Sequence, residues 1–120
     1  MSEFSVHLEE RDNFYILHMK GAIVSSTLGE LRHQVDVIAK EHNIFNRGGL
    51  KIIIDYAEVS DVDSATVANV IKRLDRLHDL GHNVAFVNLP EEMKVLIQMY
   101  KVESLFQIHT DIDTAMQVMA

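Results

Sequence analysis

Residues 50–55, with the sequence LKIIID, restrict the fold of this 120-residue chain more than any other segment. The segment is nearly all apolar and rich in β-branched isoleucine. A strand with one face in water alternates apolar and polar residues, whereas a strand covered on both faces can be apolar throughout. We therefore expect residues 50–55 to form a strand in the middle of a sheet that helices cover.

Extended and helical segments alternate around this central strand. Two extended runs, at 4–9 and 14–20, flank the polar residues 10–13 and predict a β-hairpin that ends at Gly21. Further strands are expected at 83–88 and 106–109. The spacing of apolar residues and the residues at helix ends predict four helices, which run from Leu28 to near Glu41, from Asp63 to Leu80, from Pro90 onward, and from Asp111 to Met119.

Local patterns indicate how these helices begin, end and pack. Thr27 and Glu30 have the spacing of a capping box, and Gly81 is suited to the left-handed conformation that ends a helix. Two apolar sides are predicted, with Val67, Val70, Ile71, Leu74 and Leu77 on the second helix and Val95, Leu96, Met99 and Tyr100 on the third.

The order of elements is β-β-α-β-α-β-α-β-α, in which strands and helices alternate after the hairpin. Such an order implies right-handed crossovers between parallel strands. We expect one α/β domain over residues 1–120. Its sheet should be mixed, mainly parallel and four- to five-stranded, with about four helices covering it.

Composition excludes several classes of function. Eleven Lys and Arg against eighteen Asp and Glu give a net charge of −7, which disfavours binding of nucleic acid through an overall basic field. Without cysteine the chain has no disulfide, thiolate metal site or cysteine nucleophile. No apolar run reaches the roughly 20 residues of a membrane helix, and the acidic start is unlike a signal peptide. These features predict a cytoplasmic protein that does not insert into a membrane.

The densest group of polar residues follows the central strand, at 55–66. Asp55, Glu58, Asp61 and Asp63 could together hold a hard cation. A calcium loop, however, needs a tight glycine turn, and this segment has no glycine. The simpler interpretation makes Asp63 a helix cap and leaves the other carboxylates in solvent. We predict no metal and no cofactor.

Other chemically suggestive residues have simpler explanations. His78 and His82 have the spacing of metal ligands on a helix, but Gly81 ends the helix between them. We expect His78 to extend the apolar side and His82 to lie in a turn. Ser25 and Ser26 lack a phosphate-binding loop around them and are expected only to precede the first helix. No motif combines a nucleophile, a base and an oxyanion hole, so we predict that the protein is not an enzyme.

The side of the second helix opposite its apolar residues is a further candidate site. Ala65, Asn69, Lys72 and Arg76 recur there at spacings of four, three and four. Small residues followed by long cations predict a flat, accessible surface. Taken alone, this side of the helix is better explained as a solvated face.

Read in order along nearly the whole chain, these segments resemble a STAS domain, the fold of bacterial anti-sigma factor antagonists. The residues that support the resemblance are GAIV at 21–24, IIID at 52–55, VDS at 62–64, PEEMKVL at 90–96, VESLF at 102–106 and DIDTAM at 111–116. In that family, an aspartate is followed by a serine that a partner kinase phosphorylates. The matching residue here is Ser64, and Thr66 is a secondary candidate.

The resemblance also implies partners. The kinase would be a GHKL-type serine kinase that is itself the anti-sigma factor, and a PP2C-type phosphatase would reset the switch. The predicted partner-binding residues are Asp63, Ser64, Ala65, Thr66, Asn69, Lys72 and Arg76. Ala65 and Thr66 replace the family's usual hydroxyl residue and glycine, which makes this region similar to the stressosome branch of STAS proteins.

Two functions follow from the resemblance, and composition suggests a third. The first is a phosphorylation-controlled anti-sigma factor antagonist in a bacterial partner-switching pathway. The second is a structural subunit of a larger signalling assembly such as a stressosome. The third is an accessory domain of a lipid or anion transport system, for which the six methionines and the apolar content are the only indication.

Overall fold

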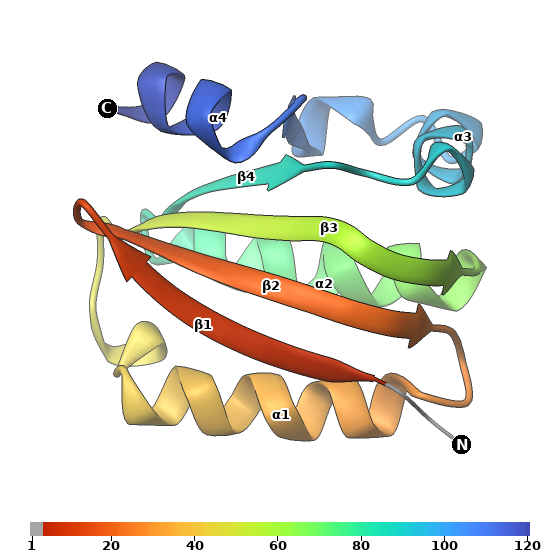
Figure 1. Cartoon of the computed structure of the whole chain (residues 1–120), viewed down its shortest axis with the longest axis horizontal. Coiled ribbons are helices and arrows are strands. Elements are labelled where there is room, and N and C mark those ends of the chain that lie inside the picture. Colours follow the sequence, from red (N-terminus) through yellow and green to blue (C-terminus); the bar gives the residue numbers. More distant parts are fainter. Residues whose placement is uncertain (1–3) are drawn as a thin grey trace.

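A five-stranded sheet in the order β1-β2-β3-β4-β5 runs through the middle of the molecule (Figure 1). The structure is a computed structural model that describes residues 4–120. β1 is antiparallel to β2, and the remaining neighbours are parallel. The strands are β1 (Ser5–Arg11), β2 (Phe14–Ile23), β3 (Lys51–Val62), β4 (Asn83–Val87) and β5 (Gln107–His109). The predicted mixed, mainly parallel sheet is confirmed.

Helices cover both faces of the sheet, as predicted. The four α-helices are α1 (Leu28–Glu41), α2 (Ser64–Asp79), α3 (Glu91–Met99) and α4 (Ile112–Met119), and short 3₁₀ turns lie at η1 (Ile44–Asn46) and η2 (Glu103–Leu105). Buried residues of α1, α2 and α3 share one core cluster with the sheet, whereas Ala115 and Met119 of α4 pack on the opposite face. Each face therefore has its own apolar core.

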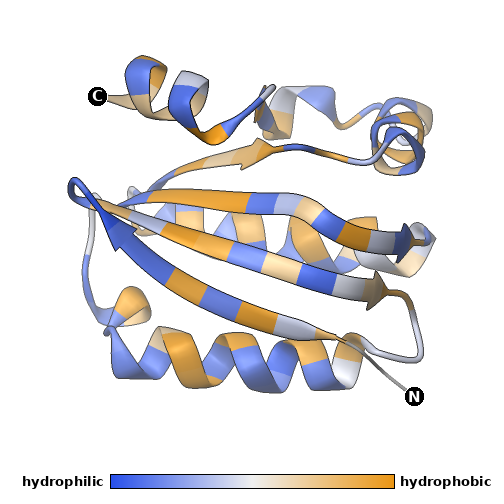
Figure 2. Cartoon of the chain, viewed as in Figure 1, coloured by the Kyte–Doolittle hydropathy of each residue, from blue (hydrophilic) through white to orange (hydrophobic). Residues whose placement is uncertain are grey.

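Strand β3 is twice as long as the sequence predicts. Its first half pairs with both β2 and β4, and there the apolar residues are continuous (Figure 2). Its second half pairs only with β2, because β4 ends opposite Asp55. The acidic residues at 55–61 therefore belong to a strand, and the predicted end of the central strand at residue 55 is wrong.

The first hairpin is also longer than predicted. Asp12 and Asn13 both have positive φ (50° and 70°), as a two-residue hairpin turn requires, so β1 extends to Arg11. Gly21 does not end β2. It has a φ of 99° beside a shift in register with β3, and the strand continues to Ile23.

Three local predictions on the helices are wrong. Thr27 precedes α1 but does not cap it with its side chain, because the hydroxyl donates to the Ala22 carbonyl and accepts from the Val24 amide. The Glu30 carboxylate accepts from Gln34 instead. His78 is exposed and does not extend the apolar side of α2.

The buried side of α3 differs from the predicted one. Met93 and Ile97 are buried, whereas Val95 and Tyr100 are about half exposed and Met99 is 66% exposed. Both sets of residues have helical spacing, so the sequence pattern does not distinguish them. The choice is made by packing, because Met93 and Ile97 lie in the same core cluster as Phe86 of β4.

Candidate functional site

The amino-terminal end of α2 is fixed by a reciprocal pair of hydrogen bonds. Asp63, which directly follows β3, accepts at Oδ1 from the Thr66 amide (3.2 Å). The Thr66 hydroxyl in turn accepts from the Asp63 amide (3.2 Å). This is a capping box, which satisfies amides that the first turn of a helix leaves unpaired. The prediction that Asp63 caps the helix is confirmed.

Thr66 also joins α2 to the sheet. Its side chain is 0% exposed, and its hydroxyl donates to the Ile23 carbonyl at the end of β2. The hydroxyl therefore has partners on both sides inside the protein. Because its hydroxyl is buried, Thr66 is a poor phosphoacceptor in the folded chain, whereas the side chain of Ser64 is exposed.

Asp63 has a second contact that the sequence does not suggest. Its Oδ2 accepts from the Ser25 amide (3.0 Å) in the segment between β2 and α1. This hydrogen bond, opposed by desolvation and joined by those from Thr66, holds the pKa of Asp63 below its usual value. The ionised carboxylate thus ties the β2–α1 connection to the start of α2.

Ser64 is the first residue of α2 and is exposed. Asp63 and Thr66, which form the capping box, hold the backbone before and after Ser64. The positive end of the helix dipole lies at this position, while Asp61 and Asp63 place negative charge nearby. Ser64 is thus a hydroxyl accessible from solvent on a backbone that the protein holds rigidly.

The predicted stripe on α2 is only partly exposed. Lys72 and Arg76 are exposed, but Ala65 and Asn69 are half-buried. Arg76 lies over the Phe45 ring, with 3.9 Å between its guanidinium carbon and the ring centroid. Asn69, Lys72 and Arg76 line a groove between α1 and α2, so the prediction of a flat surface is wrong.

The side of α2 that does continue from Ser64 includes residues absent from the predicted stripe. Ala68 and Asp75 are exposed, and together with Lys72 they follow Ser64 at helical spacing. Sequence spacing could have indicated them, because Ser64, Ala68 and Lys72 are four residues apart. The exposed surface on this side of α2 is therefore defined by Ser64, Ala68, Lys72, Asp75 and Arg76.

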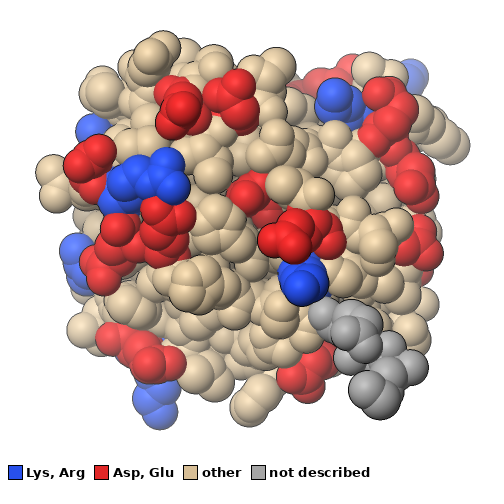
Figure 3. All heavy atoms as spheres, viewed as in Figure 1, with Lys and Arg blue, Asp and Glu red and all other residues tan. Residues whose placement is uncertain are grey.

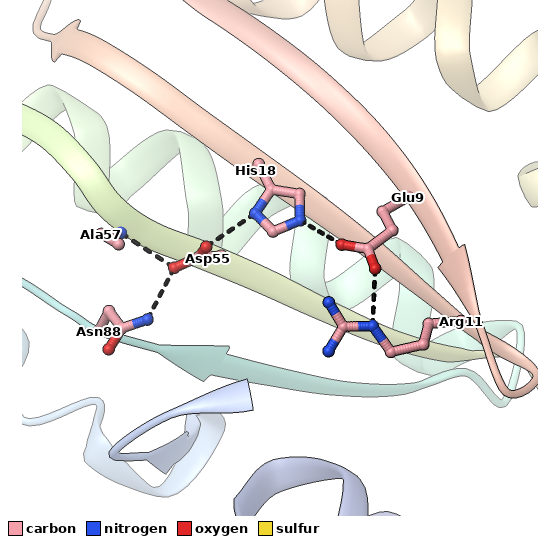
Figure 4. Close-up of polar contacts among 6 residues, drawn as sticks. All are labelled: Glu9, Arg11, His18, Asp55, Ala57 and Asn88. Carbon is pink, nitrogen blue, oxygen red and sulfur yellow. Dashed lines mark hydrogen bonds and ion pairs between the residues drawn. The ribbon is translucent and has the colours of Figure 1, made fainter. Parts of the chain in front are cut away.

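A second polar group lies on the face of the sheet that α4 covers only in part (Figure 4). His18 contacts two carboxylates, with 2.8 Å from Nδ1 to Asp55 Oδ2 and 2.8 Å from Nε2 to Glu9 Oε1. Arg11 donates to the other oxygen of Glu9 (2.6 Å), and Asn88 donates to Asp55 Oδ1 (2.9 Å). An imidazole that donates to two carboxylates has both nitrogens protonated, so the geometry suits the cationic form of His18.

The sequence did not indicate this group because its members lie on different strands. His18 is opposite Asp55 in the parallel pairing of β2 with β3, a register that no local pattern reveals. Asp55 is 7% exposed and is engaged with His18, Asn88 and the Ala57 amide, whereas Asp63 contacts Ser25 and Thr66. Two of the three aspartates of the candidate cation site, Asp55 and Asp63, thus belong to separate networks. Across residues 4–120, no three His, Asp or Glu side chains are grouped as metal ligands.

His82 has a structural role. It is 4% exposed, its Nδ1 accepts from the Leu50 amide (3.0 Å), and its Nε2 donates to the Ile44 carbonyl (2.8 Å). It lies directly after Gly81, whose φ of 78° confirms the predicted left-handed end of α2. His82 therefore connects the loop between α2 and β4 to the loop between α1 and β3 through two hydrogen bonds. Buried polar groups in proteins are commonly hydrogen-bonded in this way.

Comparison with known proteins identifies the fold. The family model of the STAS domain matches residues 5–115. The chain belongs to the STAS domain family. Among curated proteins, no sequence matches this STAS domain significantly.

Solved structures similar to this STAS domain include anti-sigma factor antagonists. A protein of Thermotoga maritima assigned to that class is 17% identical, with a TM-score of 0.78 over 95% of this chain and 93% of the other. The Bacillus cell fate determinant SpoIIAA, in its phosphorylated form, is 16% identical, with a TM-score of 0.64 over 95% of this chain and 99% of the other. At such identities, these likenesses establish the fold alone.

The same fold also occurs inside a larger protein. The murine anion transporter Slc26a9 is 15% identical, with a TM-score of 0.74 over 99% of this chain but 22% of the transporter. Within residues 4–120 of this STAS domain, no helix has the length and apolar character to cross a bilayer.

The two carboxylates around His18 predict a pH-dependent stability. Burial lowers the pKa of His18, but the hydrogen bonds that its ring donates to Glu9 and Asp55 outweigh this effect, so the net pKa is raised above 6.5. A raised pKa means that the folded state binds the proton more tightly than the unfolded state. The resulting stabilisation is complete below the unfolded-state pKa and is lost as pH rises through the folded-state pKa.

An NMR titration of the histidine ring protons tests this prediction. His18 in the folded protein should titrate above its value in urea, and Glu9→Gln should lower the folded value. Lys94→Gln on α3, a charge change away from the network, should leave it unaltered. A His18 that titrates identically in folded and unfolded protein would contradict the ionic network.

Proposed function

We propose that this STAS domain is a non-enzymatic anti-sigma factor antagonist controlled by phosphorylation of Ser64. With Ser64 unmodified, it binds a GHKL-type serine kinase that is also an anti-sigma factor. A PP2C-type phosphatase restores that state after phosphorylation. One observation supports the proposal above the others: Ser64 is exposed at the first position of α2, between two residues that hold the helix end in place.

We expect a phosphate on Ser64 to change the stability of the isolated domain only slightly. It adds roughly 1.5 to 2 negative charges. The helix dipole stabilises these by about 0.3–1 kcal/mol, whereas Asp61 and Asp63 oppose them by an amount of similar order in a water-like dielectric. Because the two effects nearly cancel, the fold should tolerate the modification.

The same phosphate should strongly affect a protein complex. A partner that packs on the start of α2 must remove water from the phosphate, at a cost of several kcal/mol unless it supplies cations. Every 1.4 kcal/mol changes affinity about tenfold. Acidic side chains predominate on the face of the domain seen in Figure 3, which lies on the other side of the sheet from α2 (Figure 1). Because the whole chain has eighteen Asp and Glu against eleven Lys and Arg, the exposed cations Lys72 and Arg76 of α2 are distinctive contacts for a partner.

Phosphopeptide mapping after incubation with the kinase and ATP tests the proposal. The wild-type domain should acquire one phosphate, located on Ser64, and Ser64→Ala should acquire none. Ser104→Ala, which removes an exposed serine near the other end of α2, should be modified like the wild type. Phosphate found on a different residue, or on Ser64→Ala, would refute the assignment.

Arg76→Glu is expected to weaken binding of the kinase by about tenfold, because it replaces a cation of the proposed contact surface with an anion. Loss of the Arg76 contact with Phe45 should lower stability by no more than about 1 kcal/mol. Calorimetric titration gives the affinity, and thermal unfolding gives the stability. Lys94→Glu on α3 is the matched control. If the two variants bind equally well, Arg76 lies outside the interface.

A further inference from the structure

A groove of about 380 Å³ lies between α1 and α2, over the sheet. Its floor is a row of apolar side chains that crosses four neighbouring strands. Leu8 of β1 is opposite Leu17 of β2, Leu17 is opposite Ile54 of β3, and Ile54 is opposite Phe86 of β4. Since adjacent strands are about 4.8 Å apart, this row is roughly 14 Å long.

The groove is open because the two helices diverge over the sheet. α1 packs against β1 and η1, α2 packs against β4 and α3, and α1 and α2 make few contacts with each other. As a result, Leu8, Leu17 and Ile54 are only half-buried. Apolar side chains of the helices, including Val35 and Val70, form the walls.

The rim of the groove is positively charged, in contrast to the chain as a whole. Four of the eleven Lys and Arg residues line it, but Asp36 is the one acidic residue among its lining residues. Asp36 is already paired with Arg73 (3.3 Å). The four cations are Arg32, Lys72, Arg73 and Arg76. In a chain with a net charge of −7, this concentration favours an anion at the mouth of the groove.

Two buried polar atoms at the groove have no hydrogen-bond partner among residues 4–120. They are Nε of Arg73, a donor, and Oδ1 of Asn69, an acceptor. Such atoms are rare in native proteins because leaving a buried polar group unpaired is costly. Neither atom is accessible to solvent, so a ligand reaches them only when the Arg73 and Asn69 side chains turn toward the groove. A carboxylate oxygen would then accept from Arg73 Nε, and the Asn69 amide can turn over to present its NH₂ group to the same ligand.

We propose that this groove binds a free long-chain fatty acid, with the alkyl chain on the apolar floor and the carboxylate at Arg73. The volume lies within the range of roughly 300–1,000 Å³ typical of small-molecule sites. A long, narrow apolar floor suits a linear alkyl chain, and the cationic rim suits its ionised end. Ser64 does not line the groove, so the ligand makes no contact with the proposed phosphorylation site, although Lys72 and Arg76 belong both to the groove and to the proposed kinase-binding surface.

Calorimetric titration and native mass spectrometry with dodecanoate test the proposal. We expect saturable binding of one dodecanoate per chain. Dodecyltrimethylammonium, which has the same chain and the opposite charge, should bind at least about tenfold more weakly. Equal affinity for the two compounds, or no saturable binding of dodecanoate, would overturn the proposal.

Variants locate the two ends of the ligand. Arg73→Gln should weaken dodecanoate binding by about tenfold, whereas Lys94→Gln on α3 and Ser64→Asp should bind as the wild type does. Val35→Trp should fill the groove and abolish binding of dodecanoate. If this variant does not fold, Val70→Phe on the opposite wall is tested in its place, with the same expected result. Undiminished binding by a folded wall variant would refute the location.

A vesicle experiment distinguishes a free fatty acid from a lipid surface. Phosphatidylglycerol vesicles without fatty acid should not sediment the domain, because the groove is proposed to hold one free chain. Sedimentation with these vesicles in the absence of dodecanoate binding would overturn the assignment to a free fatty acid and identify the groove as a membrane contact.

Discussion

Replacing Ser64 with aspartate is expected to weaken binding of the kinase by at least about a hundredfold, which corresponds to about 2.7 kcal/mol. The new carboxylate lies where the partner is proposed to pack, so binding must remove it from water. The melting temperature should stay within a few degrees of the wild type, because the side chain is exposed at the positive end of α2. Calorimetric titration and thermal unfolding measure the two quantities separately.

Ser104→Asp is the control for this experiment. It introduces the same side chain at an exposed serine in η2, away from the start of α2. This variant should bind the kinase with wild-type affinity. If Ser64→Asp loses stability in proportion to its loss of binding, Ser64 has a structural role and the proposed switch is wrong.

Replacing Thr66 with valine is expected to reduce the free energy of unfolding by about 2–3 kcal/mol. Valine has nearly the same shape, but it cannot donate to the Ile23 carbonyl or accept from the Asp63 amide. Both groups would then be left unpaired at the junction of β2, β3 and α2. Chemical denaturation gives the loss directly, and the melting temperature should fall by roughly 10 °C.

Thr66→Ser separates the hydroxyl from the methyl group of the same residue. Serine keeps the hydrogen bonds and loses one buried methyl group, so the expected cost is about 1 kcal/mol. A Thr66→Val protein as stable as Thr66→Ser would show that the capping hydroxyl contributes little. Thr66→Val should also bind the kinase less tightly, because the backbone around Ser64 would no longer be held.

Several elements were predictable because their causes are local. The helix that begins after Asp63, its end at Gly81, and the last helix after Asp111 depend on residues within one or two turns of each boundary. Ser64 was identified in a different way, because the VDS segment at 62–64 resembles the segment of STAS proteins that carries the phosphorylated serine. The false capping box at Thr27 shows the limit of local evidence. Its spacing is correct, but nearby carbonyl and amide groups engage its hydroxyl.

Other features depend on packing between distant segments. The second half of β3 is a strand because β2 extends past Gly21 and pairs with it, although its sequence is as polar as a loop. The buried side of α3 follows from its contacts with the core around Phe86. The network of His18 with Glu9 and Asp55 requires the register of three strands.

Residue patterns along the chain were thus sufficient for the class of fold and the order of elements, and the resemblance to the STAS family pointed to the serine at the start of α2. Periodicity and turn residues act through interactions between residues a few positions apart, and these can be evaluated from the sequence alone. The burial of Thr66, the carboxylates around His18 and the groove between α1 and α2 were decided by the tertiary structure. Each depends on contacts between residues that are distant in the sequence, such as His18 with Glu9, 9 residues apart, and Thr66 with the Ile23 carbonyl, 43 residues apart. Those contacts exist only after the sheet has assembled.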